Sequence, residues 1–229
     1  MITERPLLTV RRKFPRPAES SVRRFAGAAT VHLVDAMGGR GALGYAIKAI
    51  DPVSSSFAGP ALPCYAGPDD TLAVLAALAL AQPGDVIIVA TDDFRGSAVV
   101  GDLFAAMAKA AGVVAFVTDG LARDRAGIAE AAFPVFASGL SPNSAARSGP
   151  GTVGLPITIS GVRIEPGDVI VGDRDGVVVV EQAQLDDVHE RLEAVRSAEA
   201  SYPTGPDGEV QVPEYIHTLL DSDQVQYLD

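Results

Sequence analysis

The chain has 229 residues, 48% of them hydrophobic, with a mean hydropathy of +0.23 and a formal net charge of −11 at pH 7. This length suits one domain, with or without an appended tail, and the apolar fraction suffices for a core. The acidic balance disfavours nucleic acid as a partner, because phosphate binding requires clustered Lys and Arg. The basic cluster between Arg11 and Arg16 is therefore interpreted as part of a solvated N-terminal arm.

Cysteine and histidine usage limits the kinds of metal and redox site. Cys64 is the only cysteine, so an intrachain disulfide and a paired-cysteine zinc site are excluded. His32, His189 and His217 are far apart in sequence, which leaves a hard cation held by carboxylates and water. The N-terminus does not resemble a signal peptide, and the longest apolar run, residues 72–81, is too short to cross a bilayer. We therefore expect a cytoplasmic protein with no membrane partner.

The first part of the chain predicts an α/β domain. In chain order, we expect an irregular basic arm at residues 1–17, a helix at 19–37 and an extended, loop-like stretch at 54–66. The following segments then alternate: helix 69–81, strand 85–91, a glycine-containing loop at 96–101, helix 102–111, strand 113–118, helix 125–131 and strand 134–137. Buried β-branched strands that alternate with helices predict a parallel sheet.

The last third of the chain predicts a different arrangement. Residues 138–154 are polar and glycine-rich, so a loop is expected there. Short strands separated by turns then predict a β meander at 156–160, 162–164, 169–172 and 177–181. Residues 184–201 predict a helix with one charged face. The predicted organisation is the basic arm at 1–17, one domain at 18–202 and an acidic tail at 203–229.

Two loops at the carboxyl ends of predicted strands carry the candidate chemistry. Asp102 opens a helix directly after the glycine-containing loop, and Arg123 and Asp124 follow the strand at 113–118. Ligands collect at the carboxyl ends of parallel strands, so the two loops are expected to lie side by side. A helix N-terminus and an arginine suit an anionic substrate, and Asp124 suits a divalent cation. On spacing alone, a capping aspartate beside a solvated arginine remains an alternative.

Other reaction classes are disfavoured by the spacing of their residues. Ser141, Ser144 and Ser148 have no histidine in a nucleophile motif, and Cys64 is expected to be a small buried residue. The glycines at 96–101 spell neither GxGxxG nor a Walker loop, which disfavours a nucleotide or adenosylmethionine site.

Several segments together resemble the family of class II pyruvate aldolases related to the regulator of ribonuclease activity A. The family signature is Asp or Gly, then twenty residues, then Arg-Asp, and Asp102 and Arg123 enclose twenty residues. The resemblance covers about residues 20–200. The similar segments outside the signature are VHLVDAMGG (31–39), PGDVIIVA (83–90), PVFASGLSPNSAARSGPG (134–151) and LPITISGVRIEPGDVIVGDRDGVVVV (155–180).

The resemblance implies a compact α/β/β/α domain like the phosphohistidine swivelling domains, assembled as a homotrimer or hexamer with sites between subunits. It also implies Mg²⁺ or Mn²⁺ and a small 2-oxo-acid substrate. Asp124 matches the metal ligand, and Arg123 matches the residue that holds the substrate oxygens and stabilises a pyruvate enolate. The backbone N–H groups of Leu103 and Phe104, which follow Gly101, match those that bind the pyruvyl carboxylate.

Two further residues acquire roles through the resemblance, and one position departs from it. Asp102 matches a residue that handles the water that protonates the enolate, and Glu199 matches a glutamate donated by the neighbouring subunit. Aldolases of the family usually carry Asp or Glu three residues after the Asp of the Arg-Asp pair. In this chain that Asp is Asp124, and the position three residues later is Gly127. The missing carboxylate would have anchored a metal-bound water. Its absence bears on metal affinity and aldol cleavage more than on the less demanding decarboxylation of oxaloacetate.

The predicted function is a divalent-metal-dependent lyase that acts on 2-oxo acids through a pyruvate enolate. It would be an aldolase of the 4-hydroxy-4-methyl-2-oxoglutarate type, an oxaloacetate decarboxylase, or both. Lys48 and Lys109 show no setting for a Schiff base, which agrees with a metal route. Two alternatives remain: a non-enzymatic regulator that binds ribonuclease E, and a lyase of the same fold with another oxo acid.

Overall fold

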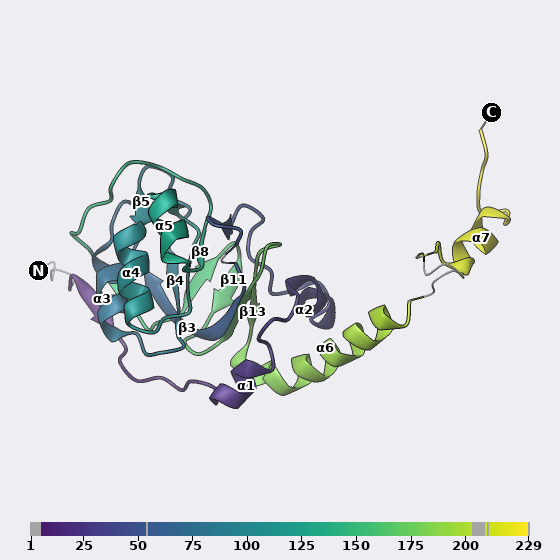
Figure 1. Cartoon of the computed structure of the whole chain (residues 1–229), viewed down its shortest axis with the longest axis horizontal. Helices are drawn as coiled ribbons and strands as arrows, with labels where there is room; N and C mark the ends of the chain where they lie inside the picture. The colour runs from purple at the N-terminus through teal and green to yellow at the C-terminus, as the bar shows by residue number, and fades with distance from the viewer. Residues whose placement is uncertain (1–5, 54, 203–208, 210, 229) are drawn as a thin grey trace, which may run out of the picture. The chain divides into compact units, whose positions relative to one another are not determined.

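Two units make up the chain in this computed structural model, Met1–Leu192 and Glu193–Asp229 (Figure 1). Of the elements in the described part of the chain, the first unit contains every strand and both hydrophobic clusters of buried residues. The structure describes residues 6–53, 55–202, 209 and 211–228.

The first unit alternates strands and helices over most of its length. Its strands are β1 (Leu8–Val10), β2 (Lys48–Ala49), β3 (Phe57–Tyr65), β4 (Val86–Ala90), β5 (Ala98–Val100), β6 (Ala115–Thr118), β7 (Leu121–Ala122), β8 (Val135–Ala137), β9 (Gly151–Val153), β10 (Ile157–Ile159), β11 (Val162–Ile164), β12 (Val169–Gly172) and β13 (Val177–Val180). Its helices are α1 (Glu19–Arg23), α2 (Thr30–Ala36), α3 (Leu72–Leu80), α4 (Asp102–Ala110), α5 (Arg125–Ala131), the 3-10 turn η1 (Gln182–Gln184) and the first part of α6 (Leu185–Ala200).

Strand β3 organises the main sheet, whose strand order is β1-β9-β3-β4-β6-β8-β2. Strands β3, β4, β6 and β8 are parallel neighbours, as the alternation of strands and helices predicts. The first half of β3 pairs antiparallel with β12, and the second half, from Ala61, pairs parallel with β4. This strand therefore joins the parallel sheet to the C-terminal hairpin.

The apolar strands of the sheet are buried on both faces. In β4, Ile87 and Val89 belong to the cluster that contains the helices, whereas Val86, Ile88 and Ala90 belong to the cluster that contains the hairpins. Successive side chains of a strand point to opposite faces, so a continuous apolar run is what a strand covered on both sides requires.

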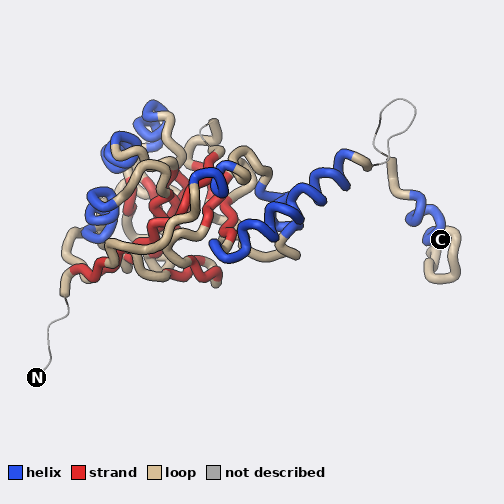
Figure 2. The backbone as a smooth tube through the Cα atoms, turned by 90° about the horizontal axis from the view of Figure 1, so that it is seen from below, coloured by secondary structure: helices blue, strands red, loops and turns tan. Residues whose placement is uncertain are grey.

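Helices and hairpins cover opposite faces of the sheet. Helices α3, α4 and α5 lie over one face (Figures 1 and 2). Their buried residues in the cluster that contains the helices include Ala77, Ala105 and Ala108, whose small side chains let the backbones of α3 and α4 approach the strands, and Ile128 of α5. Hairpins β10–β11 and β12–β13 cover the other face. The predicted α/β domain with parallel strands and a C-terminal β meander is confirmed.

Four local predictions were wrong. The segment expected to be a glycine-containing loop at 96–101 contains β5, because its apolar residues Ala98–Val100 pair with β7 and are buried. The stretch expected to be loop-like at 54–66 contains β3, in which Pro60 lies opposite Val169 of β12 and Pro63 opposite Ile88 of β4. The prolines indicated a loop because a proline cannot donate a hydrogen bond to a neighbouring strand. The single helix expected at 19–37 is two helices, α1 and α2, separated by a turn with Gly27 at positive φ. The loop expected at 138–154 contains β9, which pairs with both β1 and β3.

The N-terminal arm is not irregular throughout, which corrects the prediction for residues 1–17. Leu8–Val10 forms β1 and pairs parallel with β9. Farther along, the Arg16 guanidinium binds the buried Asp85 carboxylate with two hydrogen bonds of 2.8 Å and stacks over the ring of Phe14. The arm is therefore part of the folded first unit.

The second unit contains the end of α6 and the helix α7 (Glu214–Leu220). The predicted domain boundary at residue 202 thus lies inside this unit. None of the described side chains from residue 193 onward is buried. Among the described residues of the whole chain, no helix is long and apolar enough to cross a membrane.

Candidate functional site

The two loops expected to carry the chemistry lie side by side. Strand β5 lies inside the first of these segments and pairs in parallel with β7, which leads into the Arg-Asp pair, so that Ala98 lies opposite Leu121 and Val100 opposite Ala122. The pairing continues to the ends of the strands, because the Arg123 amide donates to the Val100 carbonyl at 2.9 Å. The start of α4 is thereby brought against the Arg-Asp pair, as the sequence predicts.

Gly101 provides the close approach between these loops. A Cβ atom at Gly101 would lie 2.6 Å from Asp124 Oδ2 and 3.2 Å from Arg123 Cγ, so any side chain would displace the pair. The glycine is buried, and Arg123 Nε lies 3.2 Å from Asp124 Oδ2. Because Gly101 has no side chain, Arg123 and Asp124 have the space to form their ion pair next to it.

Asp124 has an unusual backbone conformation at the start of α5. Its φ of 58° and ψ of 43° place it in the left-handed region, which is uncommon for a residue with a side chain. The residue is at the N-cap position, but its side chain makes no capping hydrogen bond. The carboxylate instead faces Arg123, and the two side chains are 40% and 37% exposed. Strain of this kind is often found at functional sites, and here it leaves a carboxylate accessible to a ligand.

A cation at Asp124 would depend on few protein ligands. Among the described residues, no group of three or more His, Cys, Asp or Glu side chains could hold a metal ion. A hard cation such as Mg²⁺ often binds through one or two carboxylates and keeps several waters, with further oxygens coming from the substrate. An exposed single carboxylate fits that kind of binding.

The N-terminus of α4 presents the second half of the site. Asp102 is the first residue of the helix, and its Oδ1 accepts a hydrogen bond of 2.6 Å from the Leu103 amide. Leu103 is exposed and Phe104 is partly buried against the core. The first N–H groups of a helix lack partners within the helix, so a carboxylate that bound here would share these donors with Asp102.

Gly127 lies directly against Asp102. A Cβ atom at Gly127 would be 2.7 Å from Asp102 Cβ and 2.8 Å from Asp102 Oδ2. The space that a side chain at position 127 would occupy is therefore taken by Asp102. The departure from the family pattern has a local packing consequence that the sequence alone does not reveal.

Sequence reasoning missed Ser144 as a member of this site. The Ser144 hydroxyl oxygen accepts a hydrogen bond from Arg123 Nη1. The sequence disfavours Ser144 as a nucleophile, since no histidine stands with it in a nucleophile motif. Its contact with Arg123 spans 21 positions, and no spacing rule connects a serine to an arginine across such a distance.

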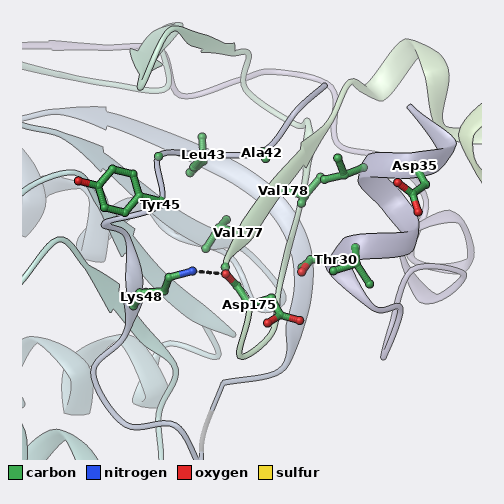
Figure 3. A pocket seen from close by; sticks show the side chains of 13 residues that line it. Thr30, Asp35, Ala42, Leu43, Tyr45, Lys48, Asp175, Val177 and Val178 are labelled. Carbon is green, nitrogen blue, oxygen red and sulfur yellow. Dashed lines mark hydrogen bonds between the residues drawn. The ribbon is translucent and has the colours of Figure 1, made fainter. Parts of the chain in front are cut away.

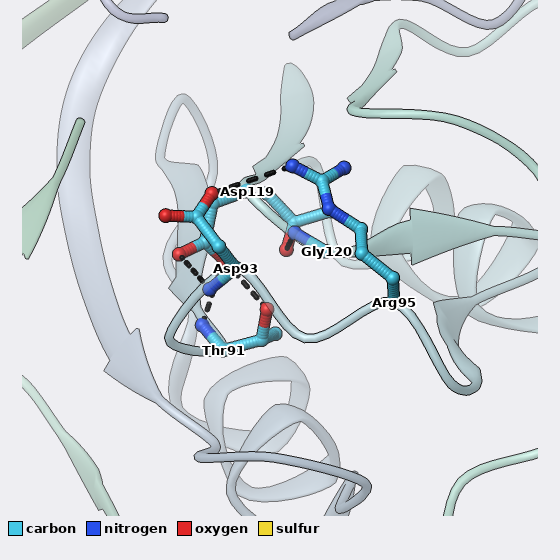
Figure 4. A network of polar contacts seen from close by, with 6 residues as sticks. Thr91, Asp93, Arg95, Asp119 and Gly120 are labelled. Atoms are coloured by element: carbon cyan, nitrogen blue, oxygen red, sulfur yellow. Dashed lines mark hydrogen bonds and ion pairs between the residues drawn. The ribbon is translucent and has the colours of Figure 1, made fainter. Parts of the chain in front are cut away.

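A buried acid that the sequence did not single out holds the loop between β4 and β5 (Figure 4). Asp119 Oδ1 accepts hydrogen bonds from the Thr91 amide at 2.7 Å and the Thr91 hydroxyl at 2.8 Å, and Asp119 Oδ2 accepts one from the Asp93 amide at 3.1 Å. Burial raises the pKa of Asp119, although these hydrogen bonds oppose the change. The acid ties the end of β4 to the turn before β7.

A separate pocket of about 360 Å³ lies between α2 and the start of β13 (Figure 3). Leu43 and Val177 contribute to its mainly apolar wall, and the Lys48 ammonium donates to the Asp175 carbonyl at its edge. None of the predicted site residues lines it. The pocket therefore offers no chemistry to the Arg-Asp pair.

The structure brings together most of the predicted site residues but leaves one untested. Gly101, Asp102, Arg123 and Asp124 meet where the two loops run side by side. Glu199 lies near the end of α6, in the second unit, and its contribution from a neighbouring subunit stays a prediction.

Comparisons with known proteins agree with the geometry. The family described as "RraA-like: Aldolase/RraA" matches residues 30–179. A protein of Halalkalibacterium halodurans named "Putative 4-hydroxy-4-methyl-2-oxoglutarate aldolase" is 37% identical over 159 residues, which is 69% of this chain and 75% of that protein.

Solved structures are similar over most of the first unit. The crystal structure of Streptomyces coelicolor RraAS2, titled an unusual member of the RNase ES inhibitor RraA protein family, has a TM-score of 0.70 and 27% identity. It covers 81% of this chain and 97% of its own. The RNA-processing inhibitor RraA from Thermus thermophilis has a TM-score of 0.61 and 26% identity, and covers 67% of this chain and 92% of its own.

Proposed function

The chain belongs to the RraA-like family, and on that premise we propose that it is a divalent-metal-dependent lyase that cleaves 2-oxo acids through a pyruvate enolate. The observation that carries the proposal is the Arg123–Asp124 pair, held against Gly101 beside the N-terminus of α4. An arginine, an accessible carboxylate and a helix N-terminus in one place suit a small anionic substrate bound next to a cation.

The residues present fit Mg²⁺ or Mn²⁺. Asp124 would hold the cation, because its carboxylate is accessible and makes no capping bond to α5. A bound cation would supply Lewis-acid polarisation of the substrate's 2-oxo group. Arg123 would bind the oxygens of the same substrate with its guanidinium, which is planar and always charged.

The chain's own residues suit the remaining steps of the proposed reaction. Bond cleavage leaves an electron pair on the carbon next to the 2-oxo group, and the negative charge spreads onto the enolate oxygen. The guanidinium of Arg123 would stabilise that oxygen, since it is positioned before the charge develops. The free N–H groups at the start of α4 would bind the pyruvyl carboxylate. Asp102 would hold the water from which the enolate carbon takes its proton.

The geometry supports decarboxylation of oxaloacetate more than aldol cleavage. In decarboxylation the bond between the third and fourth carbons breaks, carbon dioxide leaves, and the third carbon takes a proton to give pyruvate. Aldol cleavage also requires a base to remove a proton from the 4-hydroxyl group. The Asp or Glu usual at position 127 in aldolases of the family is absent, and Asp102 occupies its space.

The proposal is tested by incubating the protein with oxaloacetate and following pyruvate release with Mg²⁺, with Mn²⁺ and with excess chelator. We expect release that depends on the metal and is lost in Arg123→Ala without loss of folding. Arg191→Ala is the control, since Arg191 lies in a surface ion pair with Asp187 and should keep full activity. Turnover retained in Arg123→Ala would overturn the assignment.

We also propose that the chain assembles as a homotrimer or hexamer in which Glu199 acts in a neighbour's site. Solution mass measured by light scattering would test the assembly. Mixing Glu199→Gln subunits with Arg123→Ala subunits would test the shared site, because each inactive variant supplies what the other lacks. Partial recovery of activity in the mixture is expected, and no recovery would argue against a shared site.

A second candidate is a regulator that binds a ribonuclease without catalysis. Two observations favour it. One similar structure is described as the RNA-processing inhibitor RraA and the other as a member of the RNase ES inhibitor RraA protein family, and the net charge of −11 suits a basic partner segment. Binding to ribonuclease E in the presence of chelator, together with no release of pyruvate, would support this candidate over the lyase.

A further inference from the structure

The segment after β8 runs across the ends of the two strands that carry the site. Three isolated bridges fix its course: Leu140 pairs with Ala122, Ser144 with Ala98, and Ala146 with Asp70. Each bridge is parallel, so the segment continues the small β5–β7 sheet on both sides. Its backbone is therefore positioned by the same strands that position Arg123.

Asn143 locks this segment next to Ser144. Its carbonyl accepts from the Ala98 amide at 2.9 Å, and its side-chain Nδ2 donates to the Gly96 carbonyl at 3.0 Å. The Ser141 amide donates to the Ala122 carbonyl at 2.9 Å. The backbone around Ser144 is thus held by hydrogen bonds of its neighbours Ser141 and Asn143, and Ser144 is exposed.

The Arg123 guanidinium is bound on two of its sides. Nε lies 3.2 Å from Asp124 Oδ2, and Nη1 donates to the Ser144 hydroxyl. A guanidinium has five N–H groups, and the hydrogen bond to Ser144 uses one of the two on Nη1, so both N–H groups of Nη2 and the second one of Nη1 (the outer edge) have no hydrogen-bond partner among the described residues and can bind a ligand. Bidentate binding of a carboxylate or of two substrate oxygens requires that this edge be held in one plane.

We infer that Ser144 is a positioning residue: its hydroxyl fixes the plane of the Arg123 guanidinium so that the outer edge faces the anionic substrate. The inference rests on the proposed function, and it adds a residue that neither spacing nor the family resemblance singles out. Ser144 is not a catalytic residue in this account, since it acts through Arg123. An arginine side chain has many rotatable bonds, so a second anchor reduces the orientations that must be lost on binding.

The test combines three single variants, Ser144→Ala, Ser144→Thr and Ser148→Ala. Ser148→Ala is the matched control. It removes a hydroxyl from the same segment, and that hydroxyl has no hydrogen-bond partner among the described residues, because Ser148 binds Asp70 through its backbone amide. Ser144→Ala should lower kcat/KM for oxaloacetate by about tenfold or more, as expected for a hydrogen bond to a charged group. Ser144→Thr, which keeps the hydroxyl, should recover most of the loss, and the unfolding midpoints should agree.

Binding of oxalate, which resembles the pyruvate enolate, gives a readout that a merely structural role would not change. With Mg²⁺ present, Ser144→Ala should weaken oxalate binding in the wild-type background. The same change should have no further effect in an Arg123→Ala background, because the residue through which Ser144 acts is gone. An equal effect in both backgrounds would overturn the inference, and so would wild-type kinetics of Ser144→Ala in an active enzyme. A wild-type protein with neither turnover nor oxalate binding would overturn the proposed function, and this inference with it.

Discussion

The ion pair between the N-terminal arm and the body of the first unit gives a sharp test of how the fold is held together. Arg16 donates from Nε and Nη2 to the two Asp85 oxygens, both at 2.8 Å, and the Asp85 side chain is fully buried. Asp85 also accepts from the Gln82 amide at 2.9 Å. Arg16→Ala would remove two of these three donors and leave a buried carboxylate without its counter-charge.

The expected loss of stability follows from this geometry. Removing one partner of a buried ion pair costs about 3–5 kcal/mol, because the remaining charge is left uncompensated. The Arg16 side chain is 18% exposed, so water can reach part of the space it leaves. We therefore expect about 3 kcal/mol, near the lower end. For a domain of this size that corresponds to a fall of about 6–12 °C in the unfolding midpoint.

The assay is urea unfolding followed by circular dichroism, at one protein concentration for all variants. Arg23→Ala is the matched control, since Arg23 pairs with Glu19 at the surface, with side chains 74% and 78% exposed, and should lose less than about 0.5 kcal/mol. In an Asp85→Ala background, Arg16→Ala should cost much less than it does alone. Equal losses for Arg16→Ala and Arg23→Ala would refute the reasoning.

Three further predictions concern single residues. Gly127→Ala should displace Asp102, because the new Cβ would lie 2.7 Å from Asp102 Cβ; pyruvate release from oxaloacetate should fall, while Mn²⁺ affinity measured by magnetic resonance should stay within about twofold, since Asp124 is unchanged. Burial raises the pKa of Asp119 above its ordinary 3.8, so ionisation costs stability as pH rises from 3.8 to the folded-state value. Wild type should therefore lose stability relative to Asp119→Asn between about pH 3 and pH 7, and a gain would contradict the account. Although burial opposes it, hydrogen bonds from Thr30 and the following turn lower the pKa of Asp173 below 3.8. That stabilising contribution is present above pH 3.8 and is lost as pH falls below it. As pH rises over the same range, wild type should therefore gain stability relative to Asp173→Asn, as measured by urea unfolding.

The parallel core of the fold was predictable from local pattern. Strands β4 and β6 are short β-branched runs between helices, and burial on both faces accounts for their continuous apolar sequence. Strand β3 was missed because Pro60 and Pro63 indicate a loop when only the sequence is considered. Each proline lies opposite a residue of another strand, in β12 and β4, and such pairings are set by tertiary structure.

The candidate site, like the fold, was predictable from the sequence only in part. The meeting of the two loops followed from the rule that ligands collect at the carboxyl ends of parallel strands, and the β5–β7 pairing agrees with it. The contact of Ser144 with Arg123 and the network around Asp119 did not follow from any local pattern. Both depend on segments that cross the strand ends, and their residue types are as common in ordinary turns as in sites.

Gly127 illustrates why a departure from a family pattern has to be interpreted in space. Counted along the sequence, it is a lost carboxylate three residues after Asp124. In the structure, Asp102 lies where a Cβ at position 127 would be, so an acid cannot be restored there without moving the residue that we propose holds the protonating water. A carboxylate at 127 and the present position of Asp102 are thus alternatives on this backbone. For the lyase that we propose, this arrangement would favour decarboxylation of oxaloacetate over aldol cleavage, with Asp102 as the carboxylate that holds the protonating water.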